Sequence, residues 1–386
     1  MKHYNFLDDA QRKTLFFKEP EEFKVSSETS LLSSSLGATL YTPATRPNLM
    51  SDVRKMALKG ATSLVICLED SVPDELLEEA EANVVNFLEE LNQNSAEDLP
   101  LLFIRVRNPE HLAKVASQNK GKLGALTGFV FPKFEDFSGA ATEFLYLLNS
   151  INKDYDRPLY FMPVLESPNL IWRETRDVAL AGIKKILDEN RELVLAVRIG
   201  ATDMSGVYGL RRSPDFTIYN VHALASVIAD IVNVFGRFGD GYTITGAVWE
   251  HFDSVDRIFK PQLRETPFHD DEKLRRSLLT EGNDMFIKEI RLDGINGLFG
   301  KTIIHPSHIG LVHAFSVVTH EEYSDALALT SEVKQGGATA SVYHNRMNEA
   351  KPHFAWAQRI LIRARAFGVA NPNIDFVDFL EASRRG

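Results

Sequence analysis

The sequence predicts an α/β protein whose main domain is a closed (β/α)8 barrel, the TIM-barrel architecture. Eight apolar segments of strand length recur along the chain, and each is followed by a helix or by a gap long enough for one. A hydrophobic fraction of 44% in 386 residues is sufficient for a large core. No glycine-rich GxGxxG turn follows the first strand, which argues against an open doubly wound sheet, the competing fold. Right-handed crossovers between eight such units would gather every strand tip on one face.

The predicted strands are short, apolar and rich in β-branched residues, and they span 38–44, 63–70, 101–108, 124–133, 158–167, 192–203, 243–252 and 298–306. The first helix between them is expected over 48–60 and ends at Gly60, a typical residue after a helix. A charged helical segment is expected after Phe252.

The chain divides into three predicted parts. Residues 1–35 are polar and form an N-terminal arm, and residues 36–320 form the barrel. Residues 321–386 form a C-terminal helical extension, which is too long to be a simple last barrel helix. We therefore expect this extension to cap the barrel or to reach onto a neighbouring subunit.

Composition and charge exclude several classes of partner. The net charge of -10 and the lack of a basic cluster argue against nucleic acid. The single cysteine, Cys67, lies in an apolar run without basic neighbours, so we interpret it as a core thiol rather than a nucleophile. The N-terminal segment lacks the apolar stretch of a signal peptide, and no run is long enough for a membrane span. A cytoplasmic protein without a membrane partner is the expectation.

Two of the predicted strands end at carboxylates, Glu166 and Asp203. Neighbouring parallel strands would bring these side chains to the same edge of the barrel. Two carboxylates with open positions between them suit Mg²⁺, which prefers oxygen ligands. The alternative is that each acid caps the helix that follows its strand.

Other ionisable residues also fall at predicted strand tips, and burying them together is costly unless opposite charges or a ligand compensate them. Arg105 suits a substrate carboxylate because its planar fork matches two oxygens. Arg46 precedes a helix N-terminus and suits a phosphate or a second carboxylate. For each arginine a surface ion pair is the alternative. The full set of tip residues is Arg46, Glu69, Asp70, Arg105, Lys133, Glu166, Asp203, His251 and His305.

Seven short motifs occur in the order and spacing of a known family: YTPATRP, LEDSVPD, IRVRNP, VFPK, PVLES, GATD and KTIIHP. Together they resemble the HpcH/HpaI aldolase and citrate lyase β-subunit family over roughly residues 38–310. Within that family the chain is most similar to the C–C bond lyase branch associated with bacterial tellurite and stress-resistance clusters.

The resemblance implies a Mg²⁺-dependent TIM barrel that cleaves or forms a carbon–carbon bond of a small anionic oxo acid or hydroxy acid through a stabilised enolate. It implies Glu166 and Asp203 as metal ligands, Arg105 as the binder of the oxo-acid group, and Arg46 as a binder of the anionic part. It also implies Asp70 as an acid near the metal. Similar enzymes form trimers or hexamers with C-terminal segments crossing between subunits, so a homo-oligomer is expected.

The general base stays open among Asp70, a water on the cation and His305, and His305 is equally consistent with a structural role. Lys133 is a further candidate catalytic residue, and Glu69 is a further candidate for substrate binding. Arg107 stands where the family usually has Asn. This additional positive charge suggests that Arg107 binds a more anionic substrate, such as a phosphorylated one. The segment TPATRP lacks the glycine-containing turn of the family, which argues against a coenzyme A thioester.

Two polar segments and two rival functions complete the predictions. Arg211 and Arg212 follow Asp203 and either hold a phosphate or lie in solvent. The tail either closes over the site or contacts another subunit through His344, Asn345, Arg346 and Lys351. One rival function is a Schiff-base aldolase that uses Lys133 or Lys301. The other is a non-catalytic barrel that binds a small metabolite.

Overall fold

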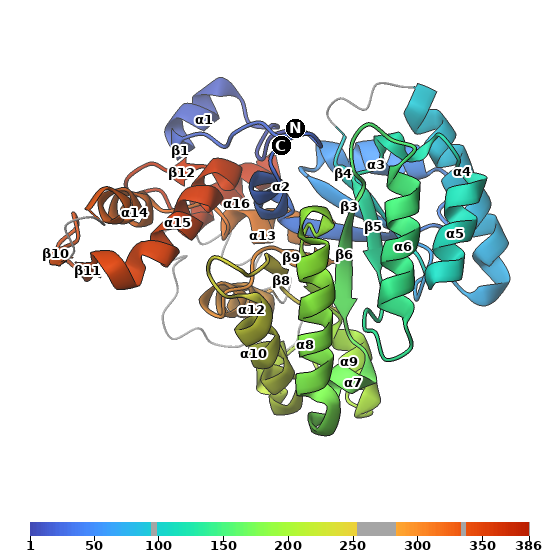
Figure 1. The fold of residues 1–386 in the computed structure, drawn as a ribbon. Helices are drawn as coiled ribbons and strands as arrows, with labels where there is room; N and C mark the ends of the chain where they lie inside the picture. Colours follow the sequence, from blue (N-terminus) through green and yellow to red (C-terminus); the bar gives the residue numbers. More distant parts are fainter. Residues whose placement is uncertain (94–98, 253–282, 333–336, 386) are drawn as a thin grey trace.

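The computed structural model describes residues 1–93, 99–252, 283–332 and 337–385. Figure 1 shows a barrel with helices on its outside and a separate layer of helices formed by the C-terminal part of the chain. The charged segment predicted after Phe252 begins outside the described residues.

The eight predicted strands are present and form one parallel sheet in the order β8-β7-β6-β5-β4-β3-β2-β9. A parallel bridge between Gly246 and Lys301 joins the region of β8 to β9 and brings the two ends of the sheet together. The predicted (β/α)8 barrel is therefore confirmed. The strands are β2 (Ala38–Pro43), β3 (Ser63–Cys67), β4 (Leu101–Arg105), β5 (Gly128–Phe131), β6 (Tyr160–Leu165), β7 (Val197–Ile199), β8 (Ile244–Thr245) and β9 (Lys301–Ile303).

Apolar residues dominate the strands because both faces of the sheet are buried. In β3, Leu64 and Ile66 pack in the core between the sheet and the helices, whereas Val65 packs in the barrel interior. This alternation follows from the twofold period of side chains along a strand. A continuous apolar run is thus the expected sequence of a barrel strand.

Two of the helices outside the barrel, which follow β2 and β4, begin at an asparagine that caps them. The side chain of Asn48 accepts a hydrogen bond from the backbone N–H of Ser51, and Asn108 does the same for His111. The outer helices are α3 (Leu49–Leu58), α4 (Leu77–Gln93), α5 (Pro109–Gln118), α6 (Ala140–Asn152), α7 (Pro168–Ile171), α8 (Arg173–Glu189), α9 (Ala201–Val207), α10 (His222–Phe235), α12 (Asp284–Ile295) and α13 (His308–Ala314).

The end of the barrel opposite the strand tips is closed by apolar side chains. Leu31 and Leu32 of α2 (Thr29–Ser35) pack in the same cluster as the inward-facing Val65 and Phe103. Phe367 from the C-terminal part joins this cluster. The strand tips are therefore the end at which a site can open.

The two ends of the chain pack against each other. Strand β1 (Phe16–Lys18) pairs antiparallel with β12 (Val369–Ala370), and Figure 1 shows the termini side by side. The remaining elements of this layer are α1 (Asp9–Leu15), α14 (His320–Glu332), the hairpin β10 (Ala338–Ala340) with β11 (Met347–Glu349), α15 (Ala350–Phe367) and α16 (Phe376–Arg385). The division at residues 35 and 320 and the contact with a neighbouring subunit stay predictions.

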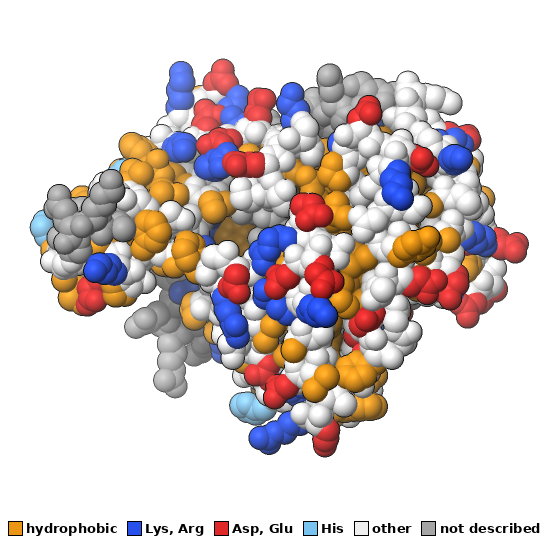
Figure 2. All heavy atoms as spheres, in the orientation of Figure 1, with side chains coloured by type: hydrophobic (Ala, Val, Ile, Leu, Met, Phe, Trp, Pro, Cys, Tyr) orange, Lys and Arg blue, Asp and Glu red, His pale blue; other side chains and the backbone are white. Residues whose placement is uncertain are grey.

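The surface in Figure 2 carries interspersed acidic and basic side chains, and hydrophobic side chains are exposed over the C-terminal layer on the left. Among the exposed residues are Phe17, Val342, Tyr343 and Met347.

In the part of the chain that the structure describes, no helix has both the length and the apolar composition needed to cross a bilayer.

Candidate active site

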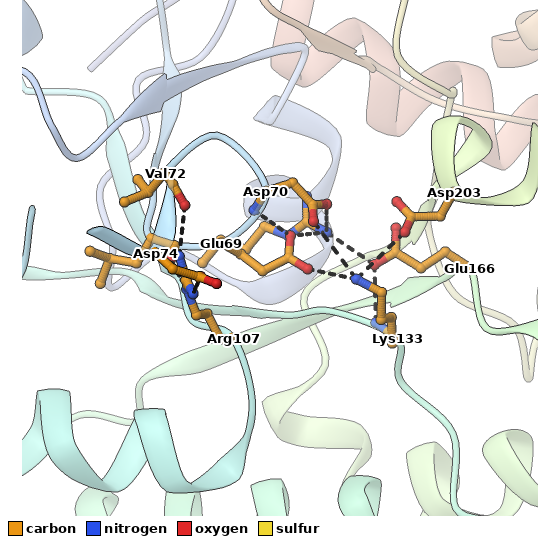
Figure 3. Close-up of polar contacts among 10 residues, drawn as sticks. Glu69, Asp70, Val72, Asp74, Arg107, Lys133, Glu166 and Asp203 are labelled. Atoms are coloured by element: carbon orange, nitrogen blue, oxygen red, sulfur yellow. Dashed lines mark hydrogen bonds and ion pairs between the residues drawn. The ribbon is translucent and has the colours of Figure 1, made fainter. Parts of the chain in front are cut away.

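Six of the predicted site residues meet at the strand tips, and Figure 3 labels five of them, all except Arg105. Glu69 and Asp70 follow β3, Arg105 ends β4, Lys133 follows β5 and Glu166 follows β6. Asp203 differs from the prediction in one respect, because β7 ends at Ile199 and Asp203 lies in the first turn of α9. The turn of the helix still aims this carboxylate toward Lys133, at 3.5 Å between Oδ1 and Nζ.

A cavity of about 590 Å³ opens at this place. Asp70, Arg105, Glu166 and Asp203 line it, and Glu69 and Lys133 contact these residues from the side. The other lining residues come mainly from the ends of β2, β7 and β9, and they include Tyr41, Thr42, Pro43, Cys67, Ser71, Val164, Arg198, Gly200, Thr202, Val248, Thr302 and Ile304.

Arg105 is the centre of the acidic cluster. Its Nη2 lies 2.8 Å from Oε2 of Glu69, 3.0 Å from Oε1 of Glu166 and 3.3 Å from Oδ2 of Asp70. The guanidinium is largely buried, and its Nε has no hydrogen-bond partner among the described residues. Arg105 therefore holds three carboxylates in place and keeps one donor for a further acceptor.

Lys133 closes the other side of the cluster. Its Nζ lies 2.7 Å from Oε1 of Glu69, and its backbone N–H donates to Oε1 of Glu166 over 3.0 Å. The backbone of Lys133 has a φ of +47°, a conformation that is uncommon for a residue other than glycine. In this conformation Lys133 contacts the tip of β3 through its side chain and the tip of β6 through its backbone.

Glycine is required at position 200, next to Glu166. A Cβ built on Gly200 would lie 1.9 Å from Oε2 of Glu166. The carboxylate therefore rests directly on the backbone at the end of β7, and its position depends on the missing side chain.

The cluster contains more negative than positive charge. Four carboxylates, Glu69, Asp70, Glu166 and Asp203, face the two cations Arg105 and Lys133. Burial raises the pKa of Glu166 to about 7. Burial and the hydrogen bond with Glu69 raise the pKa of Asp70 to about 6. Both shifts express the cost of crowding anions in a poorly hydrated place.

This imbalance fits a divalent cation. The excess of two negative charges equals the charge of Mg²⁺, and the oxygen donors are of the type that it prefers. No group of three or more His, Cys, Asp or Glu side chains arranged to hold a metal occurs among the described residues. An ion held by only two of these carboxylates would keep positions for water and substrate.

Arg46 and Arg107 do not join the cluster, contrary to the prediction that they bind substrate there. The Nε of Arg46 lies 2.8 Å from Oδ2 of Asp52, and its side chain is 55% exposed. Arg107 points away from the cavity in Figure 3 and donates to the carbonyl oxygens of Leu68 and Val72. Arg46 is held by an acid of α3, and Arg107 by carbonyl oxygens of the segment that follows β3. The argument from Arg107 for a phosphorylated substrate therefore loses its basis.

The two predicted histidines also lie outside the cavity lining. His305 contacts the hydroxyl of Ser307 at 2.7 Å and stacks on Phe252, with 5.1 Å between the ring centroids. The Nε2 of His251 lies 3.1 Å from the carbonyl oxygen of Arg212. The structure thus gives His305 local partners and does not bring it to Asp70.

Lys301 faces outward, into the layer between β9 and α12. Its Nζ lies 2.9 Å from Oε1 of Glu289 and 2.7 Å from Oδ2 of Asp293, and the side chain is buried. Arg212 also pairs with Glu289 and is buried, so the alternative that it lies in solvent was wrong. Because β-strand neighbours alternate in direction, Thr302 faces the cavity and Lys301 does not. A Schiff base on Lys301 does not fit this position.

The remaining predicted loop and tail residues do not line the cavity. Arg211 is exposed. Arg346 and Asn345 contact Glu321 within the C-terminal layer. In Figure 1 the hairpin of β10 and β11 lies at the far end of that layer, away from the barrel, so within one chain the tail does not close over the site.

The sequence analysis missed several residues of the cavity lining, among them the polar residues Tyr41, Arg198 and Thr302. Arg198 could have been found, because a single arginine within the apolar run LVLAVRIG is unusual for a buried strand. Nothing in the local sequence marks Tyr41 or Thr302. Cys67 is buried, as expected for a core thiol, and its side chain borders the cavity.

Comparisons with known proteins agree with the fold. Residues 30–369 match the family described as C–C bond lyase of the TIM-barrel fold. The CitE protein of Mycobacterium tuberculosis, in complex with magnesium, acetoacetate and coenzyme A, is 18% identical with a TM-score of 0.53 over 86% of this chain and 99% of that one. A citrate lyase of Burkholderia xenovorans is 16% identical with a TM-score of 0.57 over 94% and 97% of the two chains. A search of curated protein sequences found no match.

Proposed function

The chain belongs to the C–C bond lyase family of the TIM-barrel fold, and from this premise we propose that it is a Mg²⁺-dependent lyase or aldolase for a small oxo acid or hydroxy acid. The observation that carries this proposal is the excess of two carboxylates at the strand tips beside the cavity. The magnesium and acetoacetate in the complex of the similar CitE protein support it.

Glu166 and Asp203 are the proposed ligands of the cation. A bound cation supplies Lewis acidity, which polarises the oxo group of the substrate and stabilises the negative charge that develops there. Gly200 and the N–H of Lys133 hold Glu166 in position. Asp203 is held by the first turn of α9, within reach of Lys133.

Arg105 is the proposed electrostatic partner of the reacting acid. Its Nε is buried and has no partner among the described residues, so it can donate to an oxygen of the substrate. Fixed donors at the place where charge develops lower the barrier because they need no reorganisation during the reaction.

Asp70 is the proposed general base. It lines the cavity, and its pKa of about 6 lies close to neutral pH, where a base is most effective. In the cleavage direction Asp70 takes the proton of the substrate hydroxyl, and that oxygen becomes a carbonyl oxygen. The electron pair of the breaking C–C bond passes to the carbon next to the oxo group, and this fragment then takes up a proton.

Lys133 is better suited to fixing the carboxylates than to forming a Schiff base. Burial would lower its pKa, but the hydrogen bond with Glu69 and the charges of Glu69, Asp203 and Asp70 outweigh burial and raise it. A Schiff base requires the neutral amine. The protonated state of Lys133 therefore argues against the covalent alternative.

The test is cleavage of a panel of 4-hydroxy-2-oxo acids, followed by the release of 2-oxo acid. We expect Mg²⁺-dependent turnover in the wild type, loss on addition of EDTA, and a fall of at least about 10³-fold in kcat for Glu166→Gln and Asp203→Asn. Glu189→Gln, which changes an exposed acid on α8, is the control and should leave kcat unchanged.

Two other outcomes would decide for the rivals. A covalent adduct with Lys133 after borohydride treatment, together with activity in EDTA, would establish the Schiff-base aldolase. Saturable binding of 2-oxo acids without turnover in any variant would establish the non-catalytic barrel.

A further inference from the structure

Arg198 is the feature of the cavity that the proposed reaction does not use. It comes from β7, two residues before Gly200, and its side chain contacts residues of β2, β6 and β9 across the barrel interior. The residue is only 1% exposed and lines the same cavity as Glu166 and Asp203. A cation so deeply buried requires an explanation, because removing a charge from water costs several kcal/mol unless it is compensated.

The partners of Arg198 in the protein are neutral. Its Nη2 donates to the hydroxyl of Thr302 over 2.6 Å, and its Nη1 lies 3.3 Å from the hydroxyl of Thr39 and 3.6 Å from Sδ of Met162. Its guanidinium carbon lies 5.5 Å from the ring centroid of Tyr41. The Nε is buried and has no hydrogen-bond partner among the described residues.

The other buried cations differ from Arg198 in this respect. Each of them pairs with at least one carboxylate, and they are Arg105 with Glu69 and Glu166, Arg176 with Asp230, Arg212 with Glu289, and Lys301 with Glu289 and Asp293. Within residues 1–93, 99–252, 283–332 and 337–385, Arg198 has no carboxylate within ion-pair distance. Its charge is therefore left for a group that is not part of these residues.

We propose that Arg198, together with Thr302 and Tyr41, forms an anion subsite in the floor of the cavity that binds a second carboxylate of the substrate. The inference rests on the proposed function, because one end of the same substrate would face the acidic cluster at Glu166 and Asp203. The other end would extend toward Arg198. The substrate class is then a dicarboxylic oxo acid or hydroxy acid.

A carboxylate fits this subsite better than a phosphate. Arg198 supplies a single positive charge, and its neighbours Thr39, Thr302, Tyr41 and Met162 supply none. A carboxylate balances that charge, whereas a phosphate dianion would leave one negative charge uncompensated in the buried floor of the cavity. The planar guanidinium also matches the two oxygens of a carboxylate.

Matched pairs of probes isolate the second carboxylate. 2-Oxoglutarate and 2-oxopentanoate differ only in a terminal carboxylate against a methyl group, and oxaloacetate and 2-oxobutanoate form the shorter pair. We expect wild type to bind at least one dicarboxylate at least tenfold more tightly than its partner, measured by calorimetry with Mg²⁺. In Arg198→Gln this ratio should fall to about one while binding of the monocarboxylate stays unchanged.

The controls separate a binding role from a structural one. Arg211→Gln removes an exposed charge from the segment after α9 and should leave the ratio at its wild-type value. If Arg198→Gln fails to fold, Thr302→Val removes the hydroxyl beside Nη2 and should lower the ratio severalfold with no change for the monocarboxylate. An equal loss for both members of a pair, or an unchanged ratio, would overturn the subsite.

Two further measurements test the choice of a carboxylate and separate a failure of the subsite from a failure of the lyase proposal. Phosphonopyruvate carries a phosphonate in place of the distal carboxylate of oxaloacetate, and tighter Arg198-dependent binding of this probe would overturn the assignment to a carboxylate. The same ratios are measured in EDTA and in Glu166→Gln. An Arg198-dependent preference that persists there would uphold the subsite, and the lack of turnover by wild type with Mg²⁺ on every substrate of the panel would separately refute the lyase proposal.

Discussion

Glu166 shows how a single side chain in this site depends on its backbone surroundings. Its carboxylate contacts Arg105, accepts the N–H of Lys133 and rests on Gly200. Two of these three contacts involve backbone atoms rather than side chains. The position of the proposed metal ligand is thus set by the register of β6 against β5 and β7.

The variant Gly200→Ala tests this dependence. The added Cβ would lie 1.9 Å from Oε2 of Glu166, so the carboxylate has to move. We expect the affinity for Mg²⁺ to fall about 10–100-fold, the usual effect of disturbing the support of a metal ligand. Titration calorimetry with Mg²⁺ measures this change.

Gly206→Ala is the matched control, because a Cβ at Gly206 in the same helical region meets no atom within 4 Å. Its Mg²⁺ affinity should equal that of the wild type. Equal affinities in both variants would show that Glu166 does not hold the ion.

At the scale of elements, the contact between β9 and α12 depends on a buried ionic network. Lys301 of β9 pairs with Glu289 and Asp293 of α12, and Arg212 pairs with the same Glu289. The hydroxyl of Tyr219 donates to Oδ1 of Asp293 over 2.7 Å. The network connects the segment after α9 to α12. This connection supports the wall of the cavity from its outer side.

The variant Lys301→Met keeps the length of the side chain and removes its charge. It leaves Glu289 and Asp293 partly uncompensated in a buried place, so we expect the free energy of unfolding to fall by about 3–5 kcal/mol. Urea denaturation measures this loss. Residual activity per folded molecule should stay close to that of the wild type, because Lys301 does not line the cavity.

Lys122→Met is the control for that variant, since its partner Glu89 is half-exposed. Loss of this surface pair should cost no more than about 1 kcal/mol. If both variants lost a similar free energy of unfolding, the buried network would not stabilise the fold more than a surface ion pair does.

At the scale of the whole molecule, the N-terminal segment, the barrel and the C-terminal layer meet at two buried histidines. His3 stacks on Phe367 with 4.0 Å between ring centroids, and it lies 4.6 Å from the ring of His313. The Nε2 of His313 accepts a hydrogen bond from the N–H of Ala38 at the start of β2. Burial lowers the pKa of His313 to about 3 and lowers the pKa of His3 as well.

These pKa values predict loss of stability in mild acid. Below the ordinary histidine pKa of about 6.5 the unfolded chain binds protons that the folded molecule excludes, so stability falls as pH falls. His313 alone should cost about 2 kcal/mol at pH 5 relative to neutral pH. Denaturation at pH 7.5 and pH 5 measures this difference.

His313→Gln keeps a polar group and cannot be protonated. The variant should be less stable than the wild type at pH 7.5 and should show a smaller loss between the two pH values. The same pH dependence in both proteins would mean that His313 is not the titrating group.

The predicted trimer or hexamer is a separate expectation of the family resemblance and stays a prediction.

The sequence by itself determined the barrel and its family, because apolar strand runs and the seven motifs are local patterns. It also determined that Glu166, Arg105 and Asp70 would meet, since the tips of parallel strands share one edge. Family membership is confirmed by the match over residues 30–369.

Only the tertiary structure decided which face each residue of a strand presents and which partner each cation has. Lys301 and Thr302 are adjacent in sequence, yet one binds the carboxylates of α12 and the other borders the cavity. Arg46 and Arg107 stand at strand tips, but Asp52 of α3 and carbonyl oxygens of the segment after β3 hold them away from the cavity. Among the residues that the structure describes, Arg198 is a buried cation without a carboxylate partner. Only the closed barrel shows this, because the pairing of charges depends on distances between segments that lie far apart in the chain.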